Sequence, residues 1–323
     1  MPPPSPTRPR RAAAHRASAP RALAALAALL AAACGPGLQP APRPTPSGPA
    51  APAPAGPPPA AAAAFAYGAG QGVAVVESRA TIDVADDSGA ASDTVVTTAR
   101  VRWELGPDAG GDRALRAVVD SFAVRAGSRV PAGAAVPLPV RVTGRASGGQ
   151  VRLDPPALPP SPLPPPVAPA TPSAAPGPPS DCAGPAATVL GSVRELFPRL
   201  PGPLARGARW ADTVTTVTCP GGVRLVSTTV HRYQVAGQTE RAGRRLVRIE
   251  RTSDLAVHGE GEQARERVTA DGRGTARATL HVDPAAGRLV DLAGDSTLEL
   301  TFIGAGRVQR VVQRGTVVVR EGQ

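Results

Sequence analysis

Apolar and polar side chains alternate along most of the chain from about residue 72 onward. The alternation is clear over residues 95–105 and again over 274–283, where small or apolar residues take nearly every second position and Arg, Thr, Glu, His or Asp take most of the others. A period of two over such lengths is typical of a β-strand with one solvent-exposed face. Short runs rich in Gly, Asp and Pro separate these stretches and favour turns. The pattern predicts a mainly β, antiparallel protein.

Eleven strands are expected from this pattern. The first five cover residues 73–84, 95–105, 115–125, 140–146 and 151–153, and the other six cover 211–218, 223–235, 244–258, 265–282, 287–303 and 307–320. A sheet of so many twisted strands rarely stays flat. We therefore expect one long antiparallel meander in simple sequence order, curled into a half-barrel or cupped sheet.

One stretch follows the helical period instead. Apolar residues recur at spacings of three and four from Ala186 to Phe197, after a favourable start at Gly184-Pro185 and before Pro198. This spacing predicts a short amphipathic helix near residues 185–197. A single such helix beside a meander is expected to pack on the sheet as a lid or plug. The stretch 187–218, which runs from this helix into a strand, is interpreted as the junction between two halves of the sheet.

The N-terminus has the features of an export signal. A basic segment with five Arg precedes an apolar run over residues 22–33, which is too short to span a bilayer. The small residues before Cys34 resemble the lipobox of bacterial lipoproteins, and this resemblance implies that Cys34 becomes the lipidated first residue of the mature chain. Residues 1–33 would then be a signal peptide. The alternative is ordinary cleavage after an Ala, which would release a soluble secreted protein.

Two segments are too rich in Pro for helix or sheet. Residues 34–62 alternate Pro, Ala and Gly and are interpreted as an extended tether. Residues 155–180 are interpreted as a disordered insertion, because 13 of the 25 residues from Pro155 to Pro179 are Pro. The rest of 63–323 is expected to form a single antiparallel β domain, since neither half has enough strands or aromatic residues to close a good core alone.

Charge argues against a nucleic-acid partner. The chain has a formal net charge of +11 and all 36 basic residues are Arg, but removal of the five in the signal lowers the charge to about +6. The remaining Arg are spread along the strands between Asp and Glu, whereas a nucleic-acid binder concentrates basic residues on one face. The absence of Lys together with many Ala and Arg indicates a GC-rich genome.

Two cysteines remain for a disulfide if Cys34 carries lipid. Cys182 precedes the predicted helix and Cys219 ends the strand that follows it, in a chain sent to an oxidising compartment. We therefore predict a bridge between Cys182 and Cys219. A reactive thiol pair and two buried free thiols are the alternatives.

Recognisable catalytic chemistry is absent from the sequence. No phosphate-binding loop followed by a helix, zinc-protease motif or calcium loop occurs, and Gly294-Asp295-Ser296 is interpreted as a turn. The three His after the signal lie on separate strands, so no metal site and no cofactor are expected. Trp103, Trp210, Asp212 and Tyr233 are the candidate ligand or packing residues. The chain is expected not to be an enzyme.

A family resemblance rests on strand pattern and on one local motif. Long ordered strands with one helix, behind a lipobox and tether, resemble the cupped half-barrel of LolA/LppX-type lipoprotein carriers. The segment Phe197-Pro-x-Leu-Pro-x-Pro followed by Gly207-x-x-Trp210-x-Asp212-Thr213 is similar to uncharacterised periplasmic lipoproteins of GC-rich bacteria. The resemblance implies a helix that covers a greasy concave face.

Three functions remain open at this point. The first is a non-enzymatic envelope lipoprotein, held at the outer membrane or facing the periplasm through its lipid anchor, whose β domain binds or scaffolds another envelope protein. The second is a carrier or sensor of a lipid-like amphiphile in the cupped sheet. The third is a soluble secreted protein of unknown activity, or an enzyme whose site the sequence does not reveal.

Overall fold

The computed structural model describes residues 64–87, 89–127, 138–154, 186–219, 223–263, 266–304 and 306–322. Its only helix within these ranges is α2, Ala186–Leu196. Five strands precede it: β1 Gly70–Asp86, β2 Gly89–Leu105, β3 Asp112–Ala126, β4 Val140–Ser147 and β5 Gln150–Leu153. Six follow it: β6 Arg209–Thr218, β7 Val223–Arg241, β8 Arg244–Gln263, β9 Glu266–Asp283, β10 Arg288–Gly304 and β11 Arg307–Glu321.

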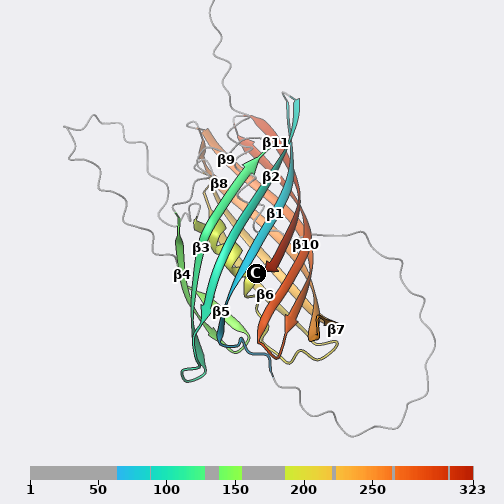
Figure 1. Cartoon of the computed structure of the whole chain (residues 1–323). Helices are drawn as coiled ribbons and strands as arrows, with labels where there is room; N and C mark the ends of the chain where they lie inside the picture. Colours follow the sequence, from blue (N-terminus) through green and yellow to red (C-terminus); the bar gives the residue numbers. More distant parts are fainter. Residues whose placement is uncertain are drawn as a thin grey trace, which may run out of the picture.

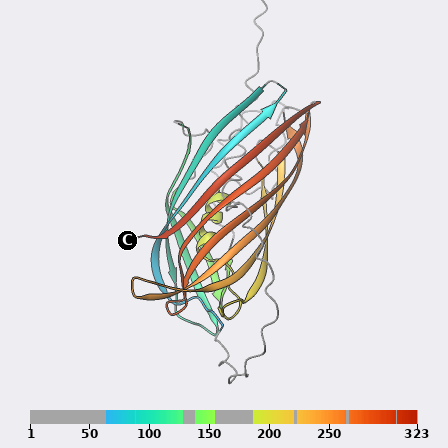
Figure 2. The ribbon, with the colours of Figure 1, turned by 90° about the vertical axis from the view of Figure 1, so that its right-hand side faces the viewer.

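All eleven strands belong to one antiparallel sheet that curls around α2 as a half-barrel (Figures 1 and 2). The predicted fold class, the eleven strands and the single short helix are therefore confirmed. Most expected boundaries agree with the observed ones within about three residues; the larger differences are at β2, which begins at Gly89 and not at 95, at β8, which ends at Gln263 and not at 258, and at β7. Strand β7 runs on to Arg241, past a register shift between Val235 and Gly237, where the sequence predicted a turn.

The strand order differs from the simple sequence order that we predicted. Neighbours follow the order β5-β4-β3-β2-β1-β11-β10-β9-β8-β7-β6, so the first and last strands pair in the middle of the sheet. Val76 lies opposite Val319 in this pairing. The stretch 187–218 does not join two paired strands, because β5 and β6 are the two outer edges of the sheet. The halves are joined by β1 and β11 instead.

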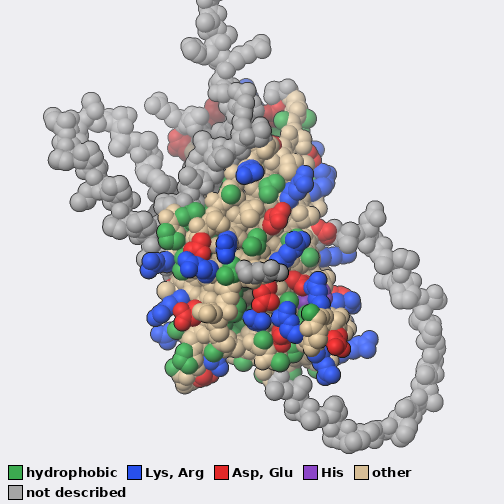
Figure 3. Space-filling view, in the orientation of Figure 1, with side chains coloured by type: hydrophobic (Ala, Val, Ile, Leu, Met, Phe, Trp, Pro, Cys, Tyr) green, Lys and Arg blue, Asp and Glu red, His purple; other side chains and the backbone are tan. Residues whose placement is uncertain are grey.

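Each strand buries one face and exposes the other, as the period of two requires. In β8 the buried side chains include Val247, Ile249, Leu255 and Val257, and the exposed ones include Arg248, Glu250, Asp254 and His258. Arg and acidic side chains are interspersed on the outer face (Figure 3). Many of them are ion-paired between strands, such as Arg232 with Asp254 and Arg314 with Asp83.

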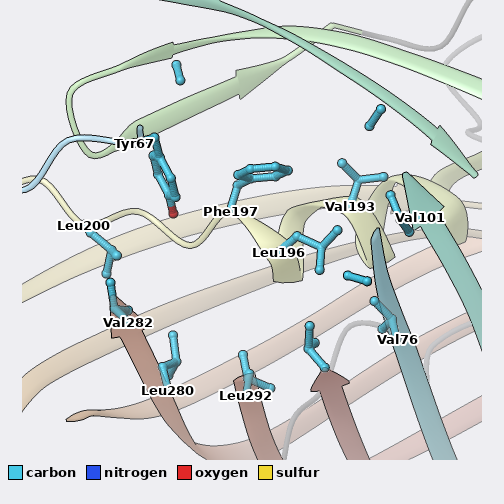
Figure 4. Packing of buried hydrophobic residues seen from close by; sticks show 14 of the residues in the cluster. Tyr67, Val76, Val101, Val193, Leu196, Phe197, Leu200, Leu280, Val282 and Leu292 are labelled. Atoms are coloured by element: carbon cyan, nitrogen blue, oxygen red, sulfur yellow. The ribbon is translucent and has the colours of Figure 1, made fainter. Parts of the chain in front are cut away.

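The concave side of the sheet is filled by α2 and by apolar side chains. Val189, Val193 and Leu196 of α2 are buried against both halves of the sheet. Figure 4 shows α2 side chains among those of β1, β2, β9 and β10. Burial of each such Val or Leu contributes roughly 1.5–3 kcal/mol. The other side of this amphipathic helix faces the pocket described below.

The segment 64–68 and the loop after α2 close one end of the half-barrel. Backbone hydrogen bonds tie Phe65 to Gly202, Tyr67 to Gly148 and Gly68 to Gly287, and a fourth runs from the Leu200 amide to the Gly149 carbonyl. The Tyr67 hydroxyl donates to the carbonyl of Pro198. Burial raises the pKa of Tyr67 well above its ordinary value. These contacts hold the loop after α2 in place.

The signal, the tether and the Pro-rich insertion all lie outside the described residues, as do Cys34 and Cys182. Among the described residues, no helix is long and apolar enough to cross a membrane.

Candidate functional site

A pocket of about 470 Å³ is lined by residues of α2 and of both edges of the sheet. We call it the seam pocket. All four residues of β5 line it, together with residues of α2, the following loop and strands β6, β7 and β8. The lining includes charged, polar and apolar side chains: Val151, Arg152, Leu153, Arg194, Glu195, Phe197, Arg199, Asp212, Thr213, Val214, Thr215, His231, Tyr233 and Arg251.

Among the described strands, each sheet edge at this pocket is hydrogen-bonded to a strand on one side only. Strands β4 and β5 pair with each other, as do β6 and β7, and β5 and β6 each have a single strand neighbour. In an antiparallel pair about half of the backbone N–H and C=O groups point away from the partner, so an edge strand presents donors and acceptors to whatever lies beside it. The seam pocket is therefore bordered by two strand edges and not only by side chains.

Arg251 is the most deeply buried charge in the pocket. Its side chain is 4% exposed, and Nη1 donates to Oε2 of Glu195 at 3.0 Å. Arg251 also hydrogen-bonds the Tyr233 side chain, while its Nε has no hydrogen-bond partner among the described residues. Burial alone would lower the pKa of Arg251, but the charge of Glu195 and the contacts with Tyr233 outweigh it and raise the pKa. Arg251 stays charged, and it holds α2 on the wall.

Tyr233 and Trp210 form a second fixed element beside this pair. Their rings stack at 5.2 Å with an interplanar angle of 7°, and the two residues are opposite each other in the β6–β7 pairing. The indole N–H of Trp210 donates to the carbonyl of Arg199 at 2.8 Å. Burial raises the pKa of Tyr233 to about 12, so its hydroxyl remains protonated at neutral pH.

His231 lies on the same wall in a row with Ser253 and Asp212. Ser253, His231 and Asp212 are successive partners across β8, β7 and β6, and His231 Nδ1 is 2.8 Å from Ser253 Oγ. Burial, helped by the charge of Arg251, lowers the pKa of His231 to about 4, so the ring is neutral at neutral pH. Asp212 instead pairs with Arg199 at 3.1 Å.

This row does not have the geometry of a Ser-His-Asp triad. Ser253 is only 3% exposed, and among the described residues no hydrogen bond joins His231 to Asp212. A triad needs an accessible nucleophile and a carboxylate that orients the imidazole. The row therefore provides a polar, hydrogen-bonded wall.

The structure brings three of the four candidate residues together. Trp210, Asp212 and Tyr233 meet at the β6–β7 end of the seam pocket, where Asp212 and Tyr233 line it. Trp103 lies on the other wall and packs edge-on against Phe197, with ring centroids 5.8 Å apart. Trp103 is thus a packing residue.

Sequence reasoning missed Arg251, Glu195 and His231. The sequence does indicate that Arg251 faces inward, because it is in phase with Val247 and Ile249 on the apolar face of the strand expected over residues 244–258. A charge in such a position needs a partner. The partner came from α2, and no spacing rule connects that helix to β8.

Only one of the two cysteines of the predicted disulfide, Cys219, is among the described residues. Cys219 follows β6 and is disulfide-bonded. Both other cysteines, Cys34 and Cys182, lie outside the described residues, so the pairing with Cys182 stays a prediction. Within the part of the chain that the structure describes, no group of three or more His, Cys, Asp or Glu side chains could hold a metal ion.

Comparison with known proteins gives no relative from which a function could be transferred, since neither a family model nor a curated protein matches this chain.

Proposed function

We propose that this protein is a non-enzymatic lipoprotein of the cell envelope, anchored through lipid on Cys34, whose β domain binds another envelope protein at the seam pocket. The signal-like N-terminus and the Pro-rich tether support the anchor. An extended tether of this length would reach on the order of 80 Å from a membrane. The domain would then bind its partner away from the lipid surface.

One observation carries the binding proposal: the two edge strands of the sheet, β5 and β6, border the same pocket. Exposed sheet edges bind extended segments of other proteins by strand addition, in which backbone hydrogen bonds supply affinity and alternate side chains supply specificity. Proteins usually protect such edges. Here β6 offers a ten-residue edge whose sequence, RWADTVTTVT, is strongly β-forming.

A second candidate is a carrier of a lipid-like amphiphile. It is favoured by the mixed lining of the seam pocket, where Phe197, Val151 and Leu153 lie near polar groups. It is disfavoured by α2, whose apolar side packs directly on both halves of the sheet and fills the concave face at that end. Mass spectrometry of small molecules extracted from purified protein tests this candidate, and a stoichiometric lipid would favour it over the protein partner.

Site-specific photo-crosslinking in living cells tests the protein partner. A photoreactive amino acid replaces Thr215 on the edge strand β6, and a matched variant carries it at Thr252. Thr252 is also an exposed Thr, but it lies on β8, which has strand neighbours on both sides. A defined adduct with an envelope protein is expected at Thr215 and not at Thr252. Identical adducts at both positions, or none at Thr215, would contradict the proposal.

The anchor is tested separately with Cys34→Ala. This variant should lose lipid, shift in its processing and leave the membrane fraction. Unchanged processing and membrane association would show that Cys34 is not the anchor, and soluble secretion of the wild type would support the alternative drawn from the sequence.

A further inference from the structure

The seam pocket has a surplus of positive charge. Its two acidic side chains are already paired, Glu195 with Arg251 and Asp212 with Arg199. Arg152 of β5 and Arg194 of α2 also line the pocket, and neither forms an ion pair with another described residue. Since His231 is neutral at neutral pH, the residues that line the pocket carry a net charge of about +2.

On both edge strands, side chains that face the core alternate with exposed ones. On β5, Val151 and Leu153 pack toward the apolar core, whereas Arg152 is exposed on the other face. On β6, Val214 is half-buried between the exposed Thr213 and Thr215. A strand placed beside either edge would direct alternate side chains toward the core side and toward the Arg152 side.

We propose that the seam pocket recognises an extended acidic segment of the partner protein, with Asp or Glu side chains on both of its faces and small apolar residues beside them. This inference rests on the proposed function and adds the chemistry of the partner. The backbone of the segment pairs with the edge of β6. Its inward side chains contact Val214 and Phe197 and place one carboxylate beside Arg194 of α2, and an outward carboxylate pairs with Arg152. Arg is suited to this role because its planar fork binds a carboxylate through two hydrogen bonds.

The same photo-crosslinking at Thr215 tests this inference in the full-length protein. Arg152→Gln combined with Arg194→Gln should lower the yield of the Thr215 adduct about tenfold, because both charge pairs are lost. The combination Arg152→Lys with Arg194→Lys should restore most of the yield. A matched control, Arg248→Gln with Arg273→Gln on the outer faces of β8 and β9, should leave the yield within about twofold. Thermal unfolding of each variant confirms that the sheet is intact.

The partner peptide in the adduct is then sequenced by mass spectrometry. An extended segment rich in Asp or Glu supports the inference. The inference is overturned if the Thr215 adduct keeps its yield in the Gln variants, or if the partner segment has no acidic residues. In either case the proposed strand-binding function stands. Failure of all adducts at Thr215 overturns both.

Discussion

Glu195 of α2 and Arg251 of β8 form an ion pair at 3.0 Å that joins the helix to the wall of the half-barrel. The Arg251 side chain is 4% exposed and that of Glu195 is 17% exposed, so water screens this pair far less than it screens the exposed pairs on the outer face. The pair sits at the seam pocket, beside the two open edges. The pair therefore joins its polar contact to the apolar packing that holds α2 beside the pocket.

Replacement of Glu195 by Ala should therefore destabilise the protein strongly. The variant leaves the charge of Arg251 buried without its carboxylate, and loss of one partner of a buried pair costs about 3–5 kcal/mol. Chemical denaturation measures the change in the free energy of unfolding.

Two further variants show that the buried charge is the cause. Glu250→Ala removes an acid from the exposed pair with Arg248 and should cost less than about 1 kcal/mol. The double variant Glu195→Leu with Arg251→Met should recover much of the lost stability, since apolar side chains can replace a buried pair. Equal losses for Glu195→Ala and Glu250→Ala would contradict this account.

Stability should fall in mild acid because of His231. Its pKa is about 4 in the folded protein and about 6.5 when unfolded, because burial and Arg251 disfavour the charged ring. Between pH 4 and pH 6.5 the unfolded chain binds more protons than the folded protein. The contribution of the neutral ring to the free energy of unfolding is therefore complete above about pH 6.5 and is lost as the pH falls toward 4. The loss is on the order of 3 kcal/mol at most.

Denaturant unfolding between pH 7.5 and pH 4 checks this, with His231→Gln compared with wild type. The difference between the two should shrink as the pH falls. His258→Gln is the matched control, because His258 is 73% exposed on the outer face. If His231→Gln keeps the full pH dependence of wild type, another group is responsible.

Gly149→Ala should damage the closed end of the half-barrel. A Cβ at this position would lie 1.8 Å from the carbonyl oxygen of Leu200, whose amide donates to the Gly149 carbonyl at 2.7 Å. The backbone of the β4–β5 turn and of the loop after α2 would have to separate, and we expect a loss of about 2 kcal/mol or more. Gly202→Ala is the control in the same region, because no heavy atom lies within 4 Å of its Cβ position. It should change stability by less than about 1 kcal/mol, and similar losses in both variants would argue against the steric explanation.

The predicted Cys182–Cys219 bridge should leave no free thiol in the exported protein. Its loop of about 37 residues corresponds to roughly 4 kcal/mol in the loop-entropy estimate. Thiol titration of denatured, unreduced protein measures the free sulfhydryls, and Cys182→Ser should expose one thiol, that of Cys219. Two free thiols in exported wild-type protein would rule the bridge out.

The strands and their faces were determined by the sequence alone. A period of two, interrupted by turn residues, is a local signal that each strand carries independently. In the strand expected over residues 244–258, this period alone puts Val247 and Ile249 on the buried face and Arg248 on the exposed one. The helix was equally local, since its apolar spacing and Pro198 define its face and its end. Even the inward position of Arg251 could have been read from its phase with Ile249.

The tertiary structure decided how these strands are joined and where the site lies. Hairpins follow from neighbouring strands and short turns, but the pairing of Val76 with Val319 connects opposite ends of the domain. That pairing depends on curvature and burial summed over the whole sheet, and it places β5 and β6 at the edges on either side of one pocket. The contact of Glu195 with Arg251 follows from the same closure. A local pattern carries no information about such distant neighbours, because their attraction exists only once the chain has curled around α2.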